Sequence, residues 1–264
     1  MKNTMSKNAI LIVSFGTSFN ETREKNIDSI EKEIMDLYPG YSIYSAWTSK
    51  MIIKKVMQRD GRIINTVSEA MEQIVRDGIE ELTVQPTHII NGLENDFMIA
   101  DVMEHSKSLR KISIGAPLLN NIEDARVIIE VLTEEYSMSD KRKALVLMGH
   151  GSSHHSNFAY AALDYSFKES GHENVFVGTI EAYPGIDVIL RSVNAYNPSE
   201  IILIPFMLVA GDHAANDMAG DEEDSWKYIF ESAGYPVKCF IKGLGEYTKI
   251  RDLYFKHLEA ALIS

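Results

Sequence analysis

The chain has 264 residues, of which 45% are hydrophobic and 24% are charged, so it can bury a sizeable core arranged as one large or two modest domains. Its 38 acidic residues outnumber 26 basic ones and give a net charge of −12, which offers no general attraction to nucleic acid or to an anionic membrane. The single cysteine, Cys239, cannot form an internal disulfide and fits a reducing compartment such as the cytoplasm.

The elements begin with an apolar run at residues 10–13, which is too short for a membrane span and is predicted to be a strand. Short β-rich runs then alternate with segments of helical period, a pattern typical of strand-helix-strand units and a parallel sheet. The predicted strands are 9–13, 41–46, 81–85, 112–115, 144–148, 174–180, 200–205 and 237–241. The predicted helices are 21–38, 67–77, 95–106, 123–136, 155–169, 186–196, 224–233 and 246–262.

A weak internal repeat divides the eight strands into four and four. ILIVSFGTS at 10–18 aligns with LVLMGHGSS at 145–153, and QPTHIING at 85–92 aligns with IPFMLVAG at 204–211. Chance can produce such a match between two apolar strands followed by glycine turns. If the repeat is genuine, it predicts two similar α/β halves, with ligands bound just beyond the carboxyl ends of the strands.

Three polar side chains follow predicted strands of the second half. His150 stands between Gly149 and Gly151, where glycines permit a sharp turn and close approach of a ligand. Glu181 directly follows an apolar strand, and His213 follows an uncharged run that ends at Ala210. Each has an ordinary alternative: a turn histidine beside a serine cap, a surface carboxylate and a satisfied core histidine.

Together these three residues predict a site for a first-row metal ion, because imidazole suits cobalt, nickel, iron and zinc and a carboxylate can complete the coordination. Their wide spacing does not establish that they converge, unlike the compact HExxH motif. The repeat places Phe15 opposite His150, Glu94 opposite His213 and, after a shift of one residue, Trp47 opposite Glu181. The first half would thus offer an apolar, aromatic wall suited to a flat macrocycle.

The expected locations of the remaining histidines and of one basic segment follow from where they lie relative to the predicted strands and helices. His88 falls late in a strand-end segment and could face a ligand, whereas His154 and His155 are expected to be solvated at the start of a helix. Three more histidines are expected at the surface: His105, His172 and His257. A basic patch that could receive carboxylates, or simply be a solvated helix face, is formed by Lys50, Lys54, Lys55, Arg59 and Arg62.

Seven motifs spread along the chain resemble those of one enzyme family. They are SFGTS at 14–18, WTSKMIIKKVMQRDG at 47–61, THIINGLE at 87–94, GAPLL at 115–119, MGHGSSHH at 148–155, EAYPGID at 181–187 and LVAGDHAANDMAGDEEDSWK at 208–227. With these motifs the chain resembles, nearly end to end, the anaerobic single-subunit cobaltochelatases of the ferrochelatase-like superfamily. The last motif is long and specific.

The resemblance implies that His150 and His213 are the active-site histidines, that Glu181 is their acidic partner and that Glu94 is a second carboxylate. It implies two Rossmann-like α/β domains, each with a four-stranded parallel sheet flanked by helices, and an active-site cleft between them. The first domain would comprise residues 1–119 with a terminal helix at 246–264. The second, residues 120–245, would carry the metal and catalytic residues.

The activity implied is insertion of Co²⁺ into sirohydrochlorin, or its reduced precorrin-2 form, in anaerobic cobalamin biosynthesis, with the histidines binding the metal and accepting pyrrole protons. Cobalt is then a substrate, and no nucleotide or redox cofactor is expected, in line with the absence of a P-loop or a GxGxxG fingerprint. A homo-oligomer is compatible with the sequence.

Three alternatives stay open. One is the same chemistry with iron or nickel, because affinity alone does not select cobalt. The second, from a different class, is a non-catalytic protein that binds a metal or a tetrapyrrole. A serine hydrolase is disfavoured, because no GxSxG elbow surrounds Ser152 or Ser153.

Overall fold

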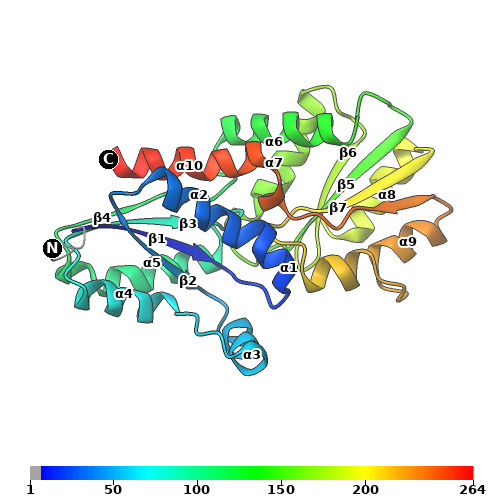
Figure 1. Cartoon of the computed structure of the whole chain (residues 1–264). Helices are drawn as coiled ribbons and strands as arrows, with labels where there is room; N and C mark the ends of the chain where they lie inside the picture. The colour runs from blue at the N-terminus through cyan, green and yellow to red at the C-terminus, as the bar shows by residue number, and fades with distance from the viewer. Residues whose placement is uncertain (1–6, 264) are drawn as a thin grey trace. The chain divides into compact units, whose positions relative to one another are not determined.

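A computed structural model describes residues 7–263 and divides the chain into two compact units (Figure 1). The first unit comprises the described residues up to Asn120 together with those from Arg251 onward. The second comprises Asn121–Ile250. Each unit contains one four-stranded parallel sheet, so the predicted fold class of two α/β halves with flanking helices is confirmed.

The first unit is built on a sheet with strand order β2-β1-β3-β4. Its strands are β1 (Asn8–Ser14), β2 (Ser42–Trp47), β3 (Glu81–Pro86) and β4 (Lys111–Ile114). Its helices are α1 (Asn20–Arg23), α2 (Ser29–Leu37), α3 (Lys50–Asp60), α4 (Val67–Arg76), α5 (Leu93–Glu104) and most of α10 (Thr248–Ile263), with a π-helical turn at Glu24–Asp28 and a 3-10 turn at Ser106–Ser108. Helices α4 and α5 cover one face of the sheet, and α2 and α10 cover the other (Figure 1).

The second unit repeats the same order as β6-β5-β7-β8. Its strands are β5 (Lys143–Gly149), β6 (Val175–Thr179), β7 (Glu200–Pro205) and β8 (Val237–Cys239). Its helices are α6 (Ile122–Glu135), α7 (Phe158–Glu169), α8 (Ile186–Tyr196) and α9 (Trp226–Ser232), with 3-10 turns at His155–Asn157 and Leu244–Glu246 and a π-helical turn at Ala214–Met218.

Both sheets are buried on their two faces, which is why their central strands read as continuous apolar runs. In β1, Leu11 packs with α4 and α5, and in β5, Val146 packs with α8 and α9. Both side chains are fully buried. These two cores hold the carboxyl ends of the strands in place, and those ends carry the residues predicted to have chemistry.

The predicted elements match the structure to within a few residues, with two exceptions. Helix α3 is not among the predicted helices, although Ser49 caps it through its hydroxyl and Gly61 ends it in the left-handed conformation. The predicted helix at 21–38 is instead α1, the π-helical turn and α2 in succession.

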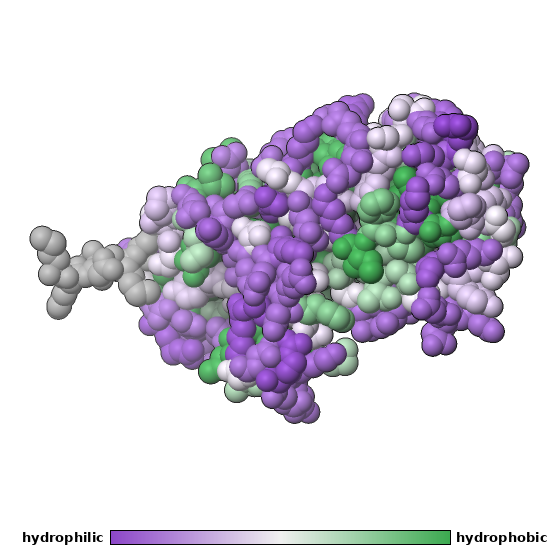
Figure 2. Space-filling model, turned by 45° about the vertical axis from the view of Figure 1, so that its right-hand side comes forward, coloured by the Kyte–Doolittle hydropathy of each residue, from purple (hydrophilic) through white to green (hydrophobic). Residues whose placement is uncertain are grey.

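The face of the molecule shown in Figure 2 is mostly hydrophilic, with apolar residues gathered in an area to the right of the middle of the view. Within residues 7–263, every helix is too short or too polar to cross a membrane.

Candidate metal centre

The three predicted ligands follow three adjacent strands of the second sheet. His150 comes directly after β5, Glu181 follows β6 and His213 lies in the loop after β7. Because β5 lies between β6 and β7 and all three strands are parallel, their carboxyl ends meet at one edge of the sheet. Residues far apart in sequence are thereby brought to one place.

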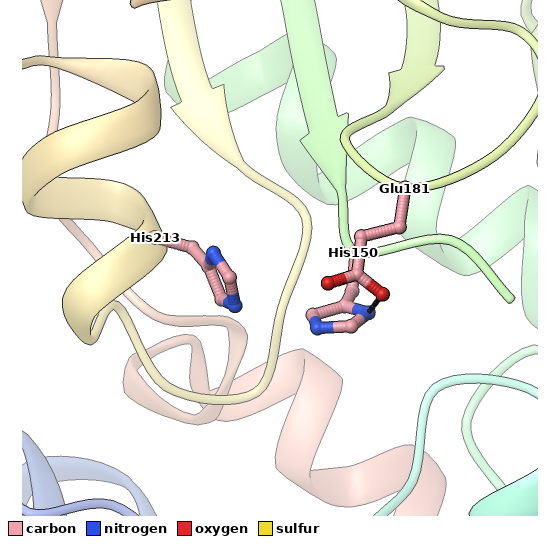
Figure 3. A group of neighbouring side chains, drawn as sticks. All are labelled: His150, Glu181 and His213. Carbon is pink, nitrogen blue, oxygen red and sulfur yellow. Dashed lines mark ion pairs between the residues drawn. The ribbon is translucent and has the colours of Figure 1, made fainter.

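One potential ligand atom from each of His150, Glu181 and His213 lies within 4.8 Å of the other two. The imidazole centroids are 4.9 Å apart with planes at 83°, and His150 Nδ1 lies 3.7 Å from Glu181 Oε2 (Figure 3). The side chains are 41%, 58% and 39% exposed for His150, Glu181 and His213. The group is therefore open to solvent, as a site that receives and passes on an ion needs to be.

The backbone at Gly151 fixes the distance between His150 and Glu181. Gly151 has φ +89°, and a Cβ at this position would lie 2.9 Å from the Cβ atoms of Thr179 and Ala182. Only glycine fits here without strain, because other residues rarely adopt a positive φ and because a Cβ would be too close to Thr179 and Ala182. The close approach lets the Glu181 amide donate a 3.0 Å hydrogen bond to the His150 carbonyl.

Asn157 joins the same two loops and was not singled out from the sequence. Its Oδ1 accepts a 3.0 Å hydrogen bond from the Ser152 amide, and its Nδ2 donates a 2.6 Å bond to the Tyr183 carbonyl. One side chain therefore ties the loop that carries His150 to the loop that carries Glu181. An asparagine shortly after a glycine turn is too common for its spacing alone to reveal this role.

The Nδ1 atoms of the two imidazoles have different partners. His150 Nδ1 lies 3.1 Å from the Gly151 carbonyl oxygen, which can only accept a hydrogen bond. His213 Nδ1 lies 2.6 Å from Asp217 Oδ2. In the tautomers that donate to these acceptors, the lone pair is on Nε2 of each ring and is available to an ion. Asp217 lies within the motif at 208–227 and was given no role of its own from the sequence.

The predicted macrocycle contacts all lie in the first unit and differ in exposure. Phe15 is 41% exposed and follows β1, and Glu94 is partly exposed in the first turn of α5. Trp47 is only 2% exposed, and its ring packs directly against Gly16. A Cβ added to Gly16 would lie 2.5 Å from this ring. It is a core residue and does not present an aromatic wall to solvent.

The hydrogen-bond register corrects the predicted partner of Glu181. In the first sheet Ser14 pairs with Trp47, and the Ser49 amide donates to the Phe15 carbonyl at 3.2 Å. In the second sheet Gly149 pairs with Thr179, and the Glu181 amide donates to the His150 carbonyl. The counterpart of Glu181 is therefore Ser49, and that of Trp47 is Thr179. The one-residue shift assumed from the sequence was therefore wrong, because the loops after β2 and β6 keep the same register and Trp47 lies two residues before the counterpart of Glu181.

His88 is partly buried in the first unit. Its Nδ1 lies 3.4 Å from Asn95 Oδ1, and its Nε2 atom is buried with no hydrogen-bond partner among residues 7–263. Burial is the main cause that lowers the pKa of His88 below its usual range, with Asn95 and Glu94 opposing it. The lowered pKa favours the neutral form of this imidazole.

The other predicted polar residues do not join the group. His154 and His155 stack on each other, with centroids 3.9 Å apart, in the turn that precedes α7. His257 is buried rather than exposed, with Nδ1 3.2 Å from the Ala116 carbonyl. The predicted basic patch lies on and just beyond α3, where all five cationic side chains are exposed, and Arg59 and Arg62 pair with Asp60 and Asp28.

Comparison with known proteins places this geometry in a family. Residues 8–263 match the family model described as cobalt chelatase (CbiK). The chain is 38% identical over 256 residues to the sirohydrochlorin cobaltochelatase of Salmonella typhimurium, covering 97% of both proteins. It is 28% identical over 261 residues to the sirohydrochlorin cobaltochelatase CbiKC of Nitratidesulfovibrio vulgaris, covering 98% of this chain and 92% of that protein.

Two solved structures share the fold at low sequence identity. SirB from Bacillus subtilis, solved with Fe³⁺, aligns with a TM-score of 0.66 at 12% identity and covers 97% of this chain and 96% of its own. CbiX, described as the terminal enzyme for siroheme biosynthesis in denitrifying bacteria, aligns with a TM-score of 0.60 at 15% identity and covers 96% and 99%. These likenesses support the fold alone, and the family match extends over nearly the whole length. The chain belongs to the cobalt chelatase family.

Proposed function

We propose that this protein is a sirohydrochlorin cobaltochelatase, in which His150, Glu181 and His213 bind Co²⁺ and pass it to the tetrapyrrole. The observation that supports this most is the meeting of two imidazoles and a carboxylate within 4.8 Å of one another at one sheet edge. The relatives named as sirohydrochlorin cobaltochelatases support the choice of substrate. The ion is a substrate here and leaves with the product.

The reaction requires two events that these residues can serve. The incoming ion exchanges its waters for ring nitrogens, and two pyrrole N–H protons leave as one divalent ion enters, so the charge of the tetrapyrrole does not change. Imidazole can bind a divalent ion and can also accept a proton at cellular pH. Three protein ligands leave coordination positions free, through which the ion can be handed to a ring nitrogen.

The assignment of roles follows from the surroundings of each group. His150 and His213 hold the ion through Nε2, and as the ion moves to the ring nitrogens the two freed Nε2 atoms can take up the two pyrrole protons. Glu181 completes the coordination or orients His150, whose Nδ1 is 3.7 Å from its carboxylate. The accessible Phe15 and Glu94 are proposed to contact the tetrapyrrole. The buried Trp47 and the partly buried His88 would support those two residues.

The chemistry needs no nucleotide and no redox cofactor, because protons are exchanged for a metal without transfer of hydride or phosphate. We expect the enzyme to act in the cytoplasm and without nucleic acid, given its acidic composition. Iron and nickel remain chemically able to use the same ligands, since affinity alone follows the Irving–Williams order. Cobalt is proposed because the family and both named relatives are cobalt chelatases.

Visible absorbance during metallation of sirohydrochlorin tests the proposal. Wild type should accelerate Co²⁺ insertion over the buffer background, whereas His150→Ala and His213→Ala should not. His155→Ala is the matched control, because it removes an exposed imidazole from the same loop without touching the group, and it should turn over like wild type. Stoichiometric binding of Co²⁺ without acceleration would instead indicate a carrier. Parallel runs with Fe²⁺ and Ni²⁺ measure the metal preference.

A further inference from the structure

A carboxylate that none of the predicted roles includes lies directly behind one metal ligand. Asp217 Oδ2 is 2.6 Å from His213 Nδ1, the shortest distance to either imidazole of the group. An ionised carboxylate has no hydrogen to donate, so this bond requires the proton to reside on Nδ1. The lone pair of His213 is then on Nε2, the nitrogen that remains free to face an ion.

The backbone holds this pair in place. His213 directly precedes the π-helical turn Ala214–Met218, and Asp217 lies within it, four residues further on. Ala214 and Met218 of this turn are fully buried in the second core. Just after the turn, a Cβ on Gly220 would lie 2.4 Å from the Asn216 carbonyl oxygen, so glycine is needed where the chain passes this close.

His150 has no equivalent of this carboxylate at bonding distance. Its Nδ1 faces the neutral Gly151 carbonyl at 3.1 Å, and the Glu181 carboxylate lies beyond hydrogen-bond range at 3.7 Å. The two histidines are therefore supported unequally. A charge-assisted bond orients a ring more strongly than a bond to a carbonyl does.

We propose that Asp217 is a positioning residue that holds His213 in the Nδ1–H tautomer and thereby sets the affinity of the site for a divalent ion. The inference rests on the proposed function only in taking Co²⁺ as the ion. Carboxylates behind metal-binding histidines act in this way generally, and their loss weakens metal binding by about 10- to 100-fold.

A purely structural role makes a different prediction for the same pair. Both side chains are substantially exposed, at 39% for His213 and 44% for Asp217, and exposed pairs contribute little to folding. Loss of Asp217 should therefore change metal binding while leaving thermal unfolding close to wild type. A structural role would instead lower the thermal unfolding temperature and leave metal binding close to wild type.

Asp217→Ala and Asp217→Asn are compared with wild type by calorimetric titration with Co²⁺ alone and by ¹⁵N NMR of the histidine rings in the metal-free protein. Asp217→Ala should raise the Kd for Co²⁺ by about 10- to 100-fold and shift the His213 proton from Nδ1 towards Nε2. Asp217→Asn should retain the tautomer, because its amide oxygen still accepts from Nδ1, and should lose less affinity than alanine. If Asp217→Ala does not fold, the tautomer and the Kd of the Asp217→Asn variant are used for the test.

Asp212→Asn is the matched control, because it removes one negative charge beside His213 from a side chain that hydrogen-bonds Asn216 instead. It should bind Co²⁺ like wild type. The proposal is overturned if Asp217→Ala leaves either the tautomer or the Kd unchanged, or if Asp212→Asn weakens binding equally. A wild-type protein that binds Co²⁺ but fails to metallate sirohydrochlorin would defeat the proposed function and leave this inference intact.

Discussion

The first strands of the two sheets end in the same backbone geometry but carry different side chains. Phe15 and His150 occupy equivalent positions, and each is followed by a glycine with φ near +90°, namely Gly16 at +98° and Gly151 at +89°. Their carbonyls accept hydrogen bonds from the Ser49 and Glu181 amides respectively. The same backbone geometry therefore holds the side chains of Phe15 and Ser49 in the first half, and those of His150 and Glu181 in the second.

This difference indicates that the edge of the sheet determines where the side chains lie, whereas the residue types determine whether they can bind a metal ion. The candidate metal centre has two imidazoles and a carboxylate at positions where the first half carries Phe15, Ser49 and, by the sequence alignment, Glu94. Substitutions that make one half resemble the other can therefore separate what the fold contributes from what the side chains contribute.

The largest effect is expected from His150→Phe, which gives the second half the residue of the first. It removes a metal ligand and proton acceptor, so turnover in cobalt insertion should fall by about 10²- to 10⁴-fold. Steady-state rates with sirohydrochlorin, together with the circular dichroism spectrum, measure this. Turnover near wild type in a folded His150→Phe protein would contradict the assignment.

Glu181→Ser, which also introduces the counterpart residue, should have the next largest effect. It leaves both imidazoles and removes the carboxylate, so Co²⁺ affinity should fall by about 10- to 100-fold. The titration is compared with Glu223→Ser, a change at an exposed acidic residue outside the group. Equal losses in both variants would mean that only overall charge matters.

Gly151→Ala and Gly16→Ala test the shared turn in each half. Both place a Cβ in the left-handed region and closer than 3.0 Å to a neighbour, so each should destabilise the protein by about 1–3 kcal/mol, measured by urea unfolding. Only Gly151→Ala should also weaken Co²⁺ binding, because it displaces Glu181 from His150. Weakened binding in Gly16→Ala would indicate that the comparison between halves is wrong.

The partly buried His88, in the first half, predicts that the free energy of unfolding depends on pH. Because its pKa is lowered in the folded state, the unfolded chain takes up the proton first, and the unfolding free energy should fall as the pH drops below about 6.5. The slope from one such group is at most about 1.4 kcal/mol per pH unit. Urea unfolding between about pH 7 and pH 5 should show a smaller slope for His88→Gln, and an unchanged slope would rule out this origin.

The smallest effect is expected from Phe15→His, which places an imidazole at the equivalent position of the first half. Its neighbour there is Ser49, so the new imidazole has no matching carboxylate, and the Co²⁺ stoichiometry should remain one. Stability should change by less than about 0.5 kcal/mol, because Phe15 is 41% exposed and lies outside the buried core. A second bound cobalt would show that the fold alone is enough to build the site.

The three side chains of the candidate site could be singled out from the sequence because they lie where parallel strands end, next to glycines that mark the turns. His150 between two glycines and Glu181 after an apolar run were visible for this reason. Trp47 was misplaced, because the aligned motifs do not include β2 or β6, so the pairing of their residues could be read only from the hydrogen-bond register. Asp217 was missed as a partner because an i, i+4 pair on a π-helical turn looks like any polar surface.

The central claim is that His150, Glu181 and His213 share one cobalt ion, and anomalous diffraction at the cobalt edge from Co²⁺-soaked crystals tests it most directly. The predicted result is one strong peak within coordination distance of a ring nitrogen of each histidine and a carboxylate oxygen of Glu181. A cobalt ion bound elsewhere, or one that contacts only one of the three side chains, would contradict the account.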